Sequence, residues 1–245
     1  MERSISFIMS AYNEERGIGA AVKTVVAKLE NYKFDYEIFI FNDGSTDRTG
    51  EIAEELAAEN SRIKVFHNSE NMNLGFNFLR GIKLVSKMFV GLLPCHNLIA
   101  SESYDNILRA FEKYQKDIIV AYIDNPQVRP LSRRFVSRFN TVLLNLLFGF
   151  GLRYYHLNFY RAALLKRLPK STNSSYALMV ELLVYALASG ASYVEVPFFR
   201  LERGIGKSKA LRFKNISDIL KTYAHLFWQV RVLKKKVEWG NVSDA

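Results

Sequence analysis

Two stretches of the chain decide the fold: residues 4–15, SISFIMSAYNEE, and residues 37–47, EIFIFNDGSTD. Each begins with a mostly apolar run of strand length and ends in a polar turn, which predicts two buried strands. Between them, apolar side chains recur at helical spacing over residues 18–29, which predicts a crossover helix. Strands joined by such a crossover run parallel, so both polar turns should lie at one edge of the sheet, where open α/β sheets bind ligands.

The second turn carries Asp43, a hydrogen-bond acceptor at the end of a strand, followed by Gly44, which permits a positive φ. Asp43 can accept a hydrogen bond from the ring N–H of uracil or guanine, or from a ribose hydroxyl. The alternative is that it only caps the helix that follows. For an Asp-Gly-Ser turn taken alone, the capping role is the favoured interpretation.

Taken together, the two turns resemble those of the family 2 glycosyltransferases of the GT-A fold, and most of all the branch with dolichyl-phosphate mannose synthase and bacterial polyprenyl-phosphate sugar synthases. The resemblance implies an α/β domain over residues 1–212, with a mixed, mostly parallel sheet flanked by helices. The apolar spacing after this domain predicts an amphipathic helical tail over residues 213–245. The resemblance also implies a nucleotide-sugar site, to which we assign Ala11, Tyr12, Asn13, Glu14, Asp43, Gly44, Asn71 and Gly75.

The loop at residues 68–75, NSENMNLG, resembles a glycine-rich family loop that passes close to the sugar nucleotide. Asn71 and Gly75 match its pattern, whereas Asn73 stands where the first glycine is usual. Because asparagine tolerates a left-handed backbone better than most residues, we expect the loop to keep its shape. For Asn71 taken singly, a surface turn is the alternative. A helix is expected to follow over residues 76–86.

The loop after the next predicted strand, residues 93–98, reads LPCHNL. The resembled family carries an acidic pair here, whose carboxylate binds a divalent ion between the donor's phosphates; this chain has His96 and Asn97. Mg²⁺ prefers oxygen ligands, whereas imidazole suits softer metals. Three interpretations stay open: His96 and Asn97 hold Mn²⁺, arginine and lysine replace the metal, or the site is inactive. A packed His96 beside Cys95 is the structural alternative.

Arginines gather within residues 128–140, directly before an uncharged stretch at residues 141–148. A solvated basic face is the default interpretation of such a cluster. By the resemblance, Arg134, Ser137 and Arg138 lie near the phosphate of a lipid acceptor. The uncharged stretch then either meets the bilayer or packs as a core helix.

A basic segment at residues 200–209, RLERGIGKSK, follows a Glu-Val-Pro strand and matches a motif of the same branch. Its two glycines predict a mobile loop that closes over phosphates and expels water. We assign Arg203 and Lys209, together with His96, to catalysis, and Ser208 to the acceptor phosphate. Without its context, this loop would be interpreted as a solvated basic turn.

The chain of 245 residues has 49% hydrophobic residues, enough for a full core, and a net charge of +10. That charge predicts a phosphate-bearing partner, but a nucleic acid is disfavoured because the basic residues cluster in two loops rather than along one face. The single cysteine indicates a reducing compartment, and no uncharged stretch reaches the roughly twenty residues that span a bilayer. We therefore expect a cytoplasmic protein, peripheral at the membrane.

The resemblance implies an inverting transferase that moves a sugar from a nucleotide donor. The sequence shows no clear catalytic base, and a polyprenyl phosphate is the predicted acceptor because an anionic acceptor needs none. Two alternatives stand: transfer to a glycan or lipid-linked saccharide, and a non-catalytic relative that keeps the nucleotide fold. The tail has an apolar face that can pack on the domain, pair with a membrane protein or a second copy, or lie on the bilayer.

Overall fold

The computed structural model describes residues 3–155, 157–168, 171, 173, 175–201 and 213–233, without the side chains of residues 213–218. Its first half alternates strands and helices: β1 (Ser4–Ala11), α1 (Ile18–Asn31), β2 (Asp35–Asp43), α2 (Thr49–Glu59), β3 (Ile63–Asn68), α3 (Asn73–Ile82), β4 (Phe89–Leu92) and α4 (Ser101–Tyr114). The second half has more helix: β5 (Ile118–Ile123), η1 (Pro126–Val128), α5 (Leu131–Phe148), β6 (Leu157–Arg161), α6 (Ala162–Arg167), α7 (Leu178–Ala188), β7 (Tyr193–Phe198), α8 (Phe213–Phe227) and η3 (Trp228–Val232).

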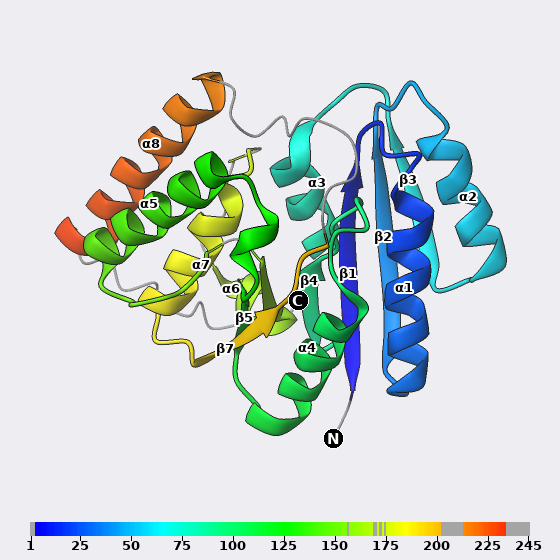
Figure 1. Ribbon diagram of the computed structural model, residues 1–245, viewed down its shortest axis with the longest axis horizontal. Helices are drawn as coiled ribbons and strands as arrows, with labels where there is room; N and C mark the ends of the chain where they lie inside the picture. Colours follow the sequence, from blue (N-terminus) through cyan, green and yellow to red (C-terminus); the bar gives the residue numbers. More distant parts are fainter. Residues whose placement is uncertain are drawn as a thin grey trace.

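The strands form one seven-stranded sheet in the order β3-β2-β1-β4-β6-β5-β7. Strand β6 runs antiparallel to both of its neighbours, and every other pair is parallel. This arrangement confirms the expected mixed, mostly parallel sheet and the parallel pairing of the first two strands. The loops after β1, β2, β3 and β4 consequently leave the same edge of the sheet (Figure 1).

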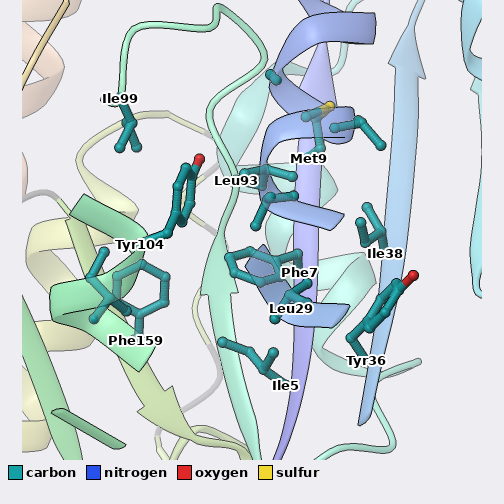
Figure 2. Close-up of a cluster of buried hydrophobic side chains, with 14 of the residues drawn as sticks. Ile5, Phe7, Met9, Leu29, Tyr36, Ile38, Leu93, Ile99, Tyr104 and Phe159 are labelled. Carbon is teal, nitrogen blue, oxygen red and sulfur yellow. The ribbon is translucent and has the colours of Figure 1, made fainter. Parts of the chain in front are cut away.

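Helices cover both faces of the sheet, because successive strand residues point to opposite sides. On β1, Phe7 and Met9 pack with α1, α2 and α4, whereas Ile8 packs with α3, α6 and α7 on the other side. Figure 2 shows the first of these cores, in which side chains of β1 and β2 meet the crossover helix α1. The helical periodicity of residues 18–29 therefore has the role predicted for it.

Helix α8 packs against the second core. Tyr223 and Leu226 are buried there, and the Tyr223 hydroxyl donates to Asn140 Oδ1 at 2.9 Å. Arg231 Nε donates to the Leu147 carbonyl at 3.1 Å, so α5 and α8 lie side by side (Figure 1). The part of the tail that the structure describes thus packs on the domain. The predicted boundary at residue 212 falls outside the described residues and stays a prediction.

Two helix boundaries differ from those expected. Helix α3 begins at Asn73 and ends at Ile82, whereas residues 76–86 were expected. Helix α5 is continuous from Leu131 to Phe148, so Arg133, Arg134 and Arg138 belong to the same helix as the uncharged stretch. Among the described residues, no helix has both the length and the apolar character that crossing a bilayer requires.

Candidate functional site

The turns after β1 and β2 are joined by hydrogen bonds, as their common sheet edge predicts. The Asn13 N–H donates to Ser45 Oγ at 3.1 Å, and Asn13 Oδ1 accepts the Thr46 N–H at 2.8 Å. The Glu14 N–H donates to the Thr49 hydroxyl at 2.8 Å. Asn13 adopts a left-handed backbone with a φ of 55°, which asparagine tolerates. The residues assigned to the first two turns therefore lie together.

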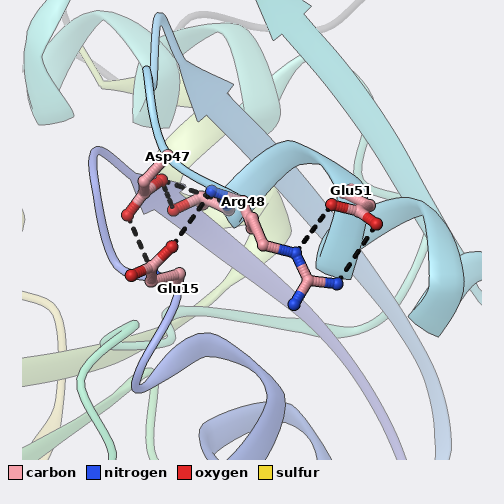
Figure 3. A network of polar contacts seen from close by, with 5 residues as sticks. Glu15, Asp47, Arg48 and Glu51 are labelled. Atoms are coloured by element: carbon pink, nitrogen blue, oxygen red, sulfur yellow. Dashed lines mark hydrogen bonds and ion pairs between the residues drawn. The ribbon is translucent and has the colours of Figure 1, made fainter.

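A second layer of contacts surrounds this junction (Figure 3). Asp47 accepts the Glu15 N–H at 3.3 Å and the Thr49 N–H at 3.0 Å, while Glu15 accepts the Arg48 N–H at 3.2 Å. Burial raises the pKa of Asp47, but the hydrogen bonds from Thr49 and Glu15 outweigh it and leave the pKa below its ordinary value. Arg48 also forms an exposed ion pair with Glu51 at 2.8 Å. The junction is thus held by an ionised carboxylate.

Asp43 is 2% exposed, and its carboxylate holds the loop after β3. Oδ1 accepts Asn68 Nδ2 and the Met72 N–H, both at 2.9 Å, and Oδ2 accepts the Asn73 N–H at 3.1 Å. Asp43 therefore caps α3 and not α2, the helix that follows it in the sequence. A direct contact from Asp43 to a nucleotide base stays a prediction, for which Oδ2 retains one lone pair.

The assigned residues Gly44, Asn71 and Gly75 lie beside or within the loop that Asp43 holds. Gly44 has a φ of 71°, and a Cβ at this position would lie 2.6 Å from the Glu70 carbonyl carbon, so the two loops touch. Asn73 also has a φ of 71°, so asparagine takes a left-handed backbone here, as expected. Asn71 is exposed and caps the loop by accepting the Asn73 N–H at 3.2 Å. Gly75 is buried in the first turn of α3.

A buried amide network, which was not predicted from the sequence, lies beneath this loop. Asn68 Nδ2 donates to Asn77 Oδ1 at 2.8 Å as well as to Asp43, and Asn77 Nδ2 donates to Ser10 Oγ at 2.9 Å. Asn77 is fully buried. Its place between apolar residues of α3 was the available signal, because a buried amide requires hydrogen-bond partners.

His96 lies beside the turn after β1. Its Nδ1 is 3.0 Å from Glu14 Oε1 and 3.6 Å from Cys95 Sγ, and these three ligand atoms lie within 4.8 Å of one another. Asn97 follows on the same loop and is half-buried, and its role as a metal ligand stays a prediction. The set of imidazole, thiol and carboxylate does not fit the all-oxygen coordination of Mg²⁺.

The residues assigned to the acceptor and to catalysis are only partly described. Arg203, Ser208 and Lys209 lie outside the described residues. The start of their segment is anchored, because the Leu201 N–H donates to the Leu98 carbonyl at 2.9 Å, two residues after His96.

On α5, Arg134 and Arg138 are exposed and Ser137 is half-buried. Within the described part of the chain, neither guanidinium makes a hydrogen bond or an ion pair.

Two further arginines, which were not assigned to the site, act electrostatically on Tyr154. Burial raises the pKa of Tyr154, and the positive charges of Arg129 and Arg200 oppose this rise. Asn125 holds the Arg200 backbone, accepting its N–H at 2.8 Å and donating to its carbonyl at 2.9 Å. Arg200 also pairs with Ile99 in a β-bridge. A cationic cluster thus adjoins the loop after β4.

The sequence of the chain is similar to those of known glycosyltransferases. The model of the family described as Glycosyl transferase family 2 matches residues 6–180. Polyprenol monophosphomannose synthase of Mycolicibacterium smegmatis is 26% identical over 235 residues, covering 91% of this chain and 86% of the relative. The uncharacterized glycosyltransferase EpsJ of Bacillus subtilis is 31% identical over 117 residues, covering 47% of this chain and 32% of the relative, so the chain spans about a third of EpsJ.

Among solved structures, the fold is shared with glucosyl-3-phosphoglycerate synthase of Mycobacterium tuberculosis, crystallised with Mn²⁺, UDP-glucose and phosphoglyceric acid. The TM-score is 0.67 at 16% identity, and the match covers 92% of this chain and 80% of that chain. The expected GT-A type fold is thereby confirmed.

Proposed function

The chain belongs to glycosyl transferase family 2, and from that premise we propose that it moves a sugar from a nucleoside diphosphate to a polyprenyl phosphate, with inversion, at a membrane surface. The M. smegmatis relative, which matches most of the chain, is named for a polyprenol monophosphomannose product, and this name supports the proposed acceptor class. The observation that carries the lipid acceptor is the exposed apolar face of α5.

This apolar face runs along the whole of α5. Its members are large side chains at 65, 72, 71, 49 and 77% exposure: Leu131, Phe135, Phe139, Val142 and Leu146. Their spacing of three and four residues places them on one side of the helix. A continuous exposed stripe of this size marks an interaction surface rather than scattered apolar residues.

Charges beside the stripe favour an anionic bilayer as its partner. Arg134 and Arg138 are one turn apart, exposed, and border the apolar residues. An interfacial helix buries its apolar side among acyl chains while its basic residues meet lipid phosphates. We therefore propose that α5 lies on the cytoplasmic face of the membrane, with Arg134, Ser137 and Arg138 nearest the acceptor phosphate.

The cationic cluster links this surface to the loops at the sheet edge. Arg129 stands two residues before α5, and Arg200 pairs with Ile99, three residues after His96. A phosphate presented from the bilayer would meet Arg129 and Arg200 between α5 and the donor loops. Guanidinium groups suit this role because they bind phosphate with two parallel hydrogen bonds.

The reaction follows from the charge of its reactants. An acceptor phosphate oxygen attacks C1 of the sugar, the bond from C1 to the diphosphate oxygen breaks, and its electron pair leaves with the diphosphate. The acceptor arrives as an anion, so no side chain has to remove a proton. The leaving diphosphate requires positive charge, which we assign to Arg203 and Lys209. Use of Mn²⁺ or Mg²⁺ beside these groups stays a prediction.

Transfer is tested with the purified full chain, radiolabelled UDP-, GDP- and other nucleotide sugars, and undecaprenyl or dolichyl phosphate in detergent. We expect label from one donor to enter the organic phase as an acid-labile product. Arg129→Gln and Arg200→Gln should each reduce this transfer at least tenfold. The matched control is Arg62→Gln. Arg62 directly precedes β3, so it lies at the amino ends of the strands, away from the loops that form the site, and its guanidinium stacks over the Tyr36 ring.

The same assay separates the alternatives. If the label enters a glycan or a lipid-linked saccharide but not the lipid phosphate, the acceptor is that saccharide and not a polyprenyl phosphate. Donor binding without transfer to any acceptor would favour the non-catalytic relative.

A further inference from the structure

Glu14, Cys95 and His96 form a group of three different donors at the meeting of two loops. Glu14 belongs to the turn after β1, and the other two follow β4. Cys95 is 6% exposed, while the side chains of His96 and Glu14 are 40% and 24% exposed. A buried thiol therefore forms the floor of the group, and the imidazole and the carboxylate form its rim.

The backbone holds this group in place. The Glu14 N–H donates to the Thr49 hydroxyl at 2.8 Å, and the Glu14 carbonyl accepts the N–H of Gly17 at 2.9 Å. A Cβ on Gly17 would lie 2.9 Å from the Cys95 carbonyl oxygen and 3.0 Å from His96 Cα. The two loops are thus packed backbone against backbone, so the three donors do not have to be gathered by an incoming ion.

The separation between Cys95 Sγ and His96 Nδ1 matches two ligands of a tetrahedral ion of borderline softness. With zinc–sulfur bonds of about 2.3 Å and zinc–nitrogen bonds of about 2.0–2.1 Å, tetrahedral geometry separates the two ligands by about 3.6 Å. Cys95 Sγ and His96 Nδ1 are 3.6 Å apart, and Glu14 Oε1 is 3.0 Å from the same nitrogen. Zinc accepts thiolate, imidazole and carboxylate together, whereas Mg²⁺ demands six oxygens.

We propose that Glu14, Cys95 and His96 bind Zn²⁺ as three protein ligands, leaving a fourth coordination position open. Three protein ligands with one open position is the arrangement of zinc sites that bind substrate. The rim position of His96 and Glu14 turns that open position outward from the buried thiol. We assign the open coordination position to an oxygen of the donor diphosphate. This assignment rests on the proposed function, whereas zinc binding itself does not.

Cobalt provides the direct test, because Co²⁺ can replace Zn²⁺ in such a site and the absorption spectrum of bound Co²⁺ depends on the ligands that hold it. Cys95 is the single cysteine of the chain, so a thiolate-to-cobalt charge-transfer band in the wild-type protein identifies it without any variant. We expect one equivalent of Co²⁺ to produce this band together with intense tetrahedral visible bands. One equivalent of Zn²⁺ should abolish both, and a large excess of Mg²⁺ should not.

Variants then assign the other two ligands. Cys95→Ser should remove the charge-transfer band, and His96→Gln and Glu14→Gln should each weaken Co²⁺ affinity at least tenfold. His225→Gln is the matched control, because His225 is exposed on α8, and it should leave the affinity unchanged. Unfolding curves of the metal-free variants show whether each still folds.

A wild-type protein that gives no charge-transfer band would overturn the proposal and leave Glu14 and His96 as an ion pair only. Equal competition by Mg²⁺ would overturn it as well. All these measurements are made without nucleotide sugar, so they test zinc binding independently of sugar transfer. Either proposal can therefore fail while the other succeeds.

Discussion

The carboxylate of Asp43, at the end of β2, accepts the N–H of Asn73, the first residue of α3, across 30 residues of sequence at 3.1 Å. This bond sets where α3 begins. It also fixes the loop after β3 against the turn after β2, where Gly44 meets Glu70. One buried carboxylate therefore organises two of the loops to which we assign the nucleotide sugar.

Replacing this carboxylate by an amide tests its structural role. In Asp43→Asn, an NH₂ group replaces one of the carboxylate oxygens. Because this group cannot accept the hydrogen bonds that the oxygen accepts in the wild type, at least one buried hydrogen bond is lost. We expect the free energy of unfolding to fall by about 1–3 kcal/mol, measured by urea denaturation. Asp124→Asn is the control, since Asp124 is exposed. Equal stability of the two variants would show that Asp43 does not hold the loop.

Gly44 offers a second test of the contact between the loops. Gly44→Ala strains a φ of 71° and also drives a Cβ into the Glu70 backbone. Gly190→Ala strains a φ of 86°, but its Cβ meets nothing within 4 Å. We expect about 1–2 kcal/mol of destabilisation from the φ strain alone at Gly190 and clearly more at Gly44, by thermal unfolding. Equal losses would contradict the close approach.

The carboxylate of Asp47 predicts a dependence on pH. Its pKa in the folded chain is lower than the ordinary value of 3.8, so folding favours the ionised form. The resulting stabilisation is complete above about pH 5 and is lost as the pH falls through the lowered pKa. The stability difference between wild type and Asp47→Asn should therefore be constant from pH 7 to about pH 5 and shrink toward pH 3. A difference that grows on acidification would refute this assignment.

The exposed face of α5 predicts membrane binding that depends on its aromatic residues. Phe135→Ser with Phe139→Ser should preserve folding, because both rings are over 70% exposed, and should weaken binding to vesicles with anionic lipids at least tenfold. Co-sedimentation with vesicles measures this. Tyr114→Ser is the control, since Tyr114 is 41% exposed at the end of α4, on the other face of the sheet. Binding unaffected by the double change would exclude α5 as the contact surface.

The part of the fold that the sequence predicted rests on local periodicity. The apolar runs of β1 and β2 and the spacing in α1 depend on residues within a few positions of one another. The start of α3 could not be predicted in this way. Asn73 and Gly75 have the composition of a loop, and the cap that makes them helical comes from Asp43 on another strand.

The site shows the same division between local and tertiary information. The turns after β1 and β2 were expected at one edge because a crossover makes their strands parallel. The contact of Glu14 with His96 depends on β4 pairing beside β1, a neighbour relation that no local pattern encodes. The exposed apolar stripe on α5 was not predicted from the sequence, because it begins at Leu131 among arginines that hide its helical spacing.

The central claim is that the loops after β1, β2, β3 and β4 form one nucleotide-sugar site. Hydrogen–deuterium exchange of the full chain, with and without each member of a panel of nucleotide sugars, measures this directly. One donor should slow exchange at residues 11–15, 43–47, 68–73 and 93–97 together, and leave the far ends of the strands unchanged. Protection from exchange that is confined to another part of the chain would contradict the account. So would the absence of protection with every donor.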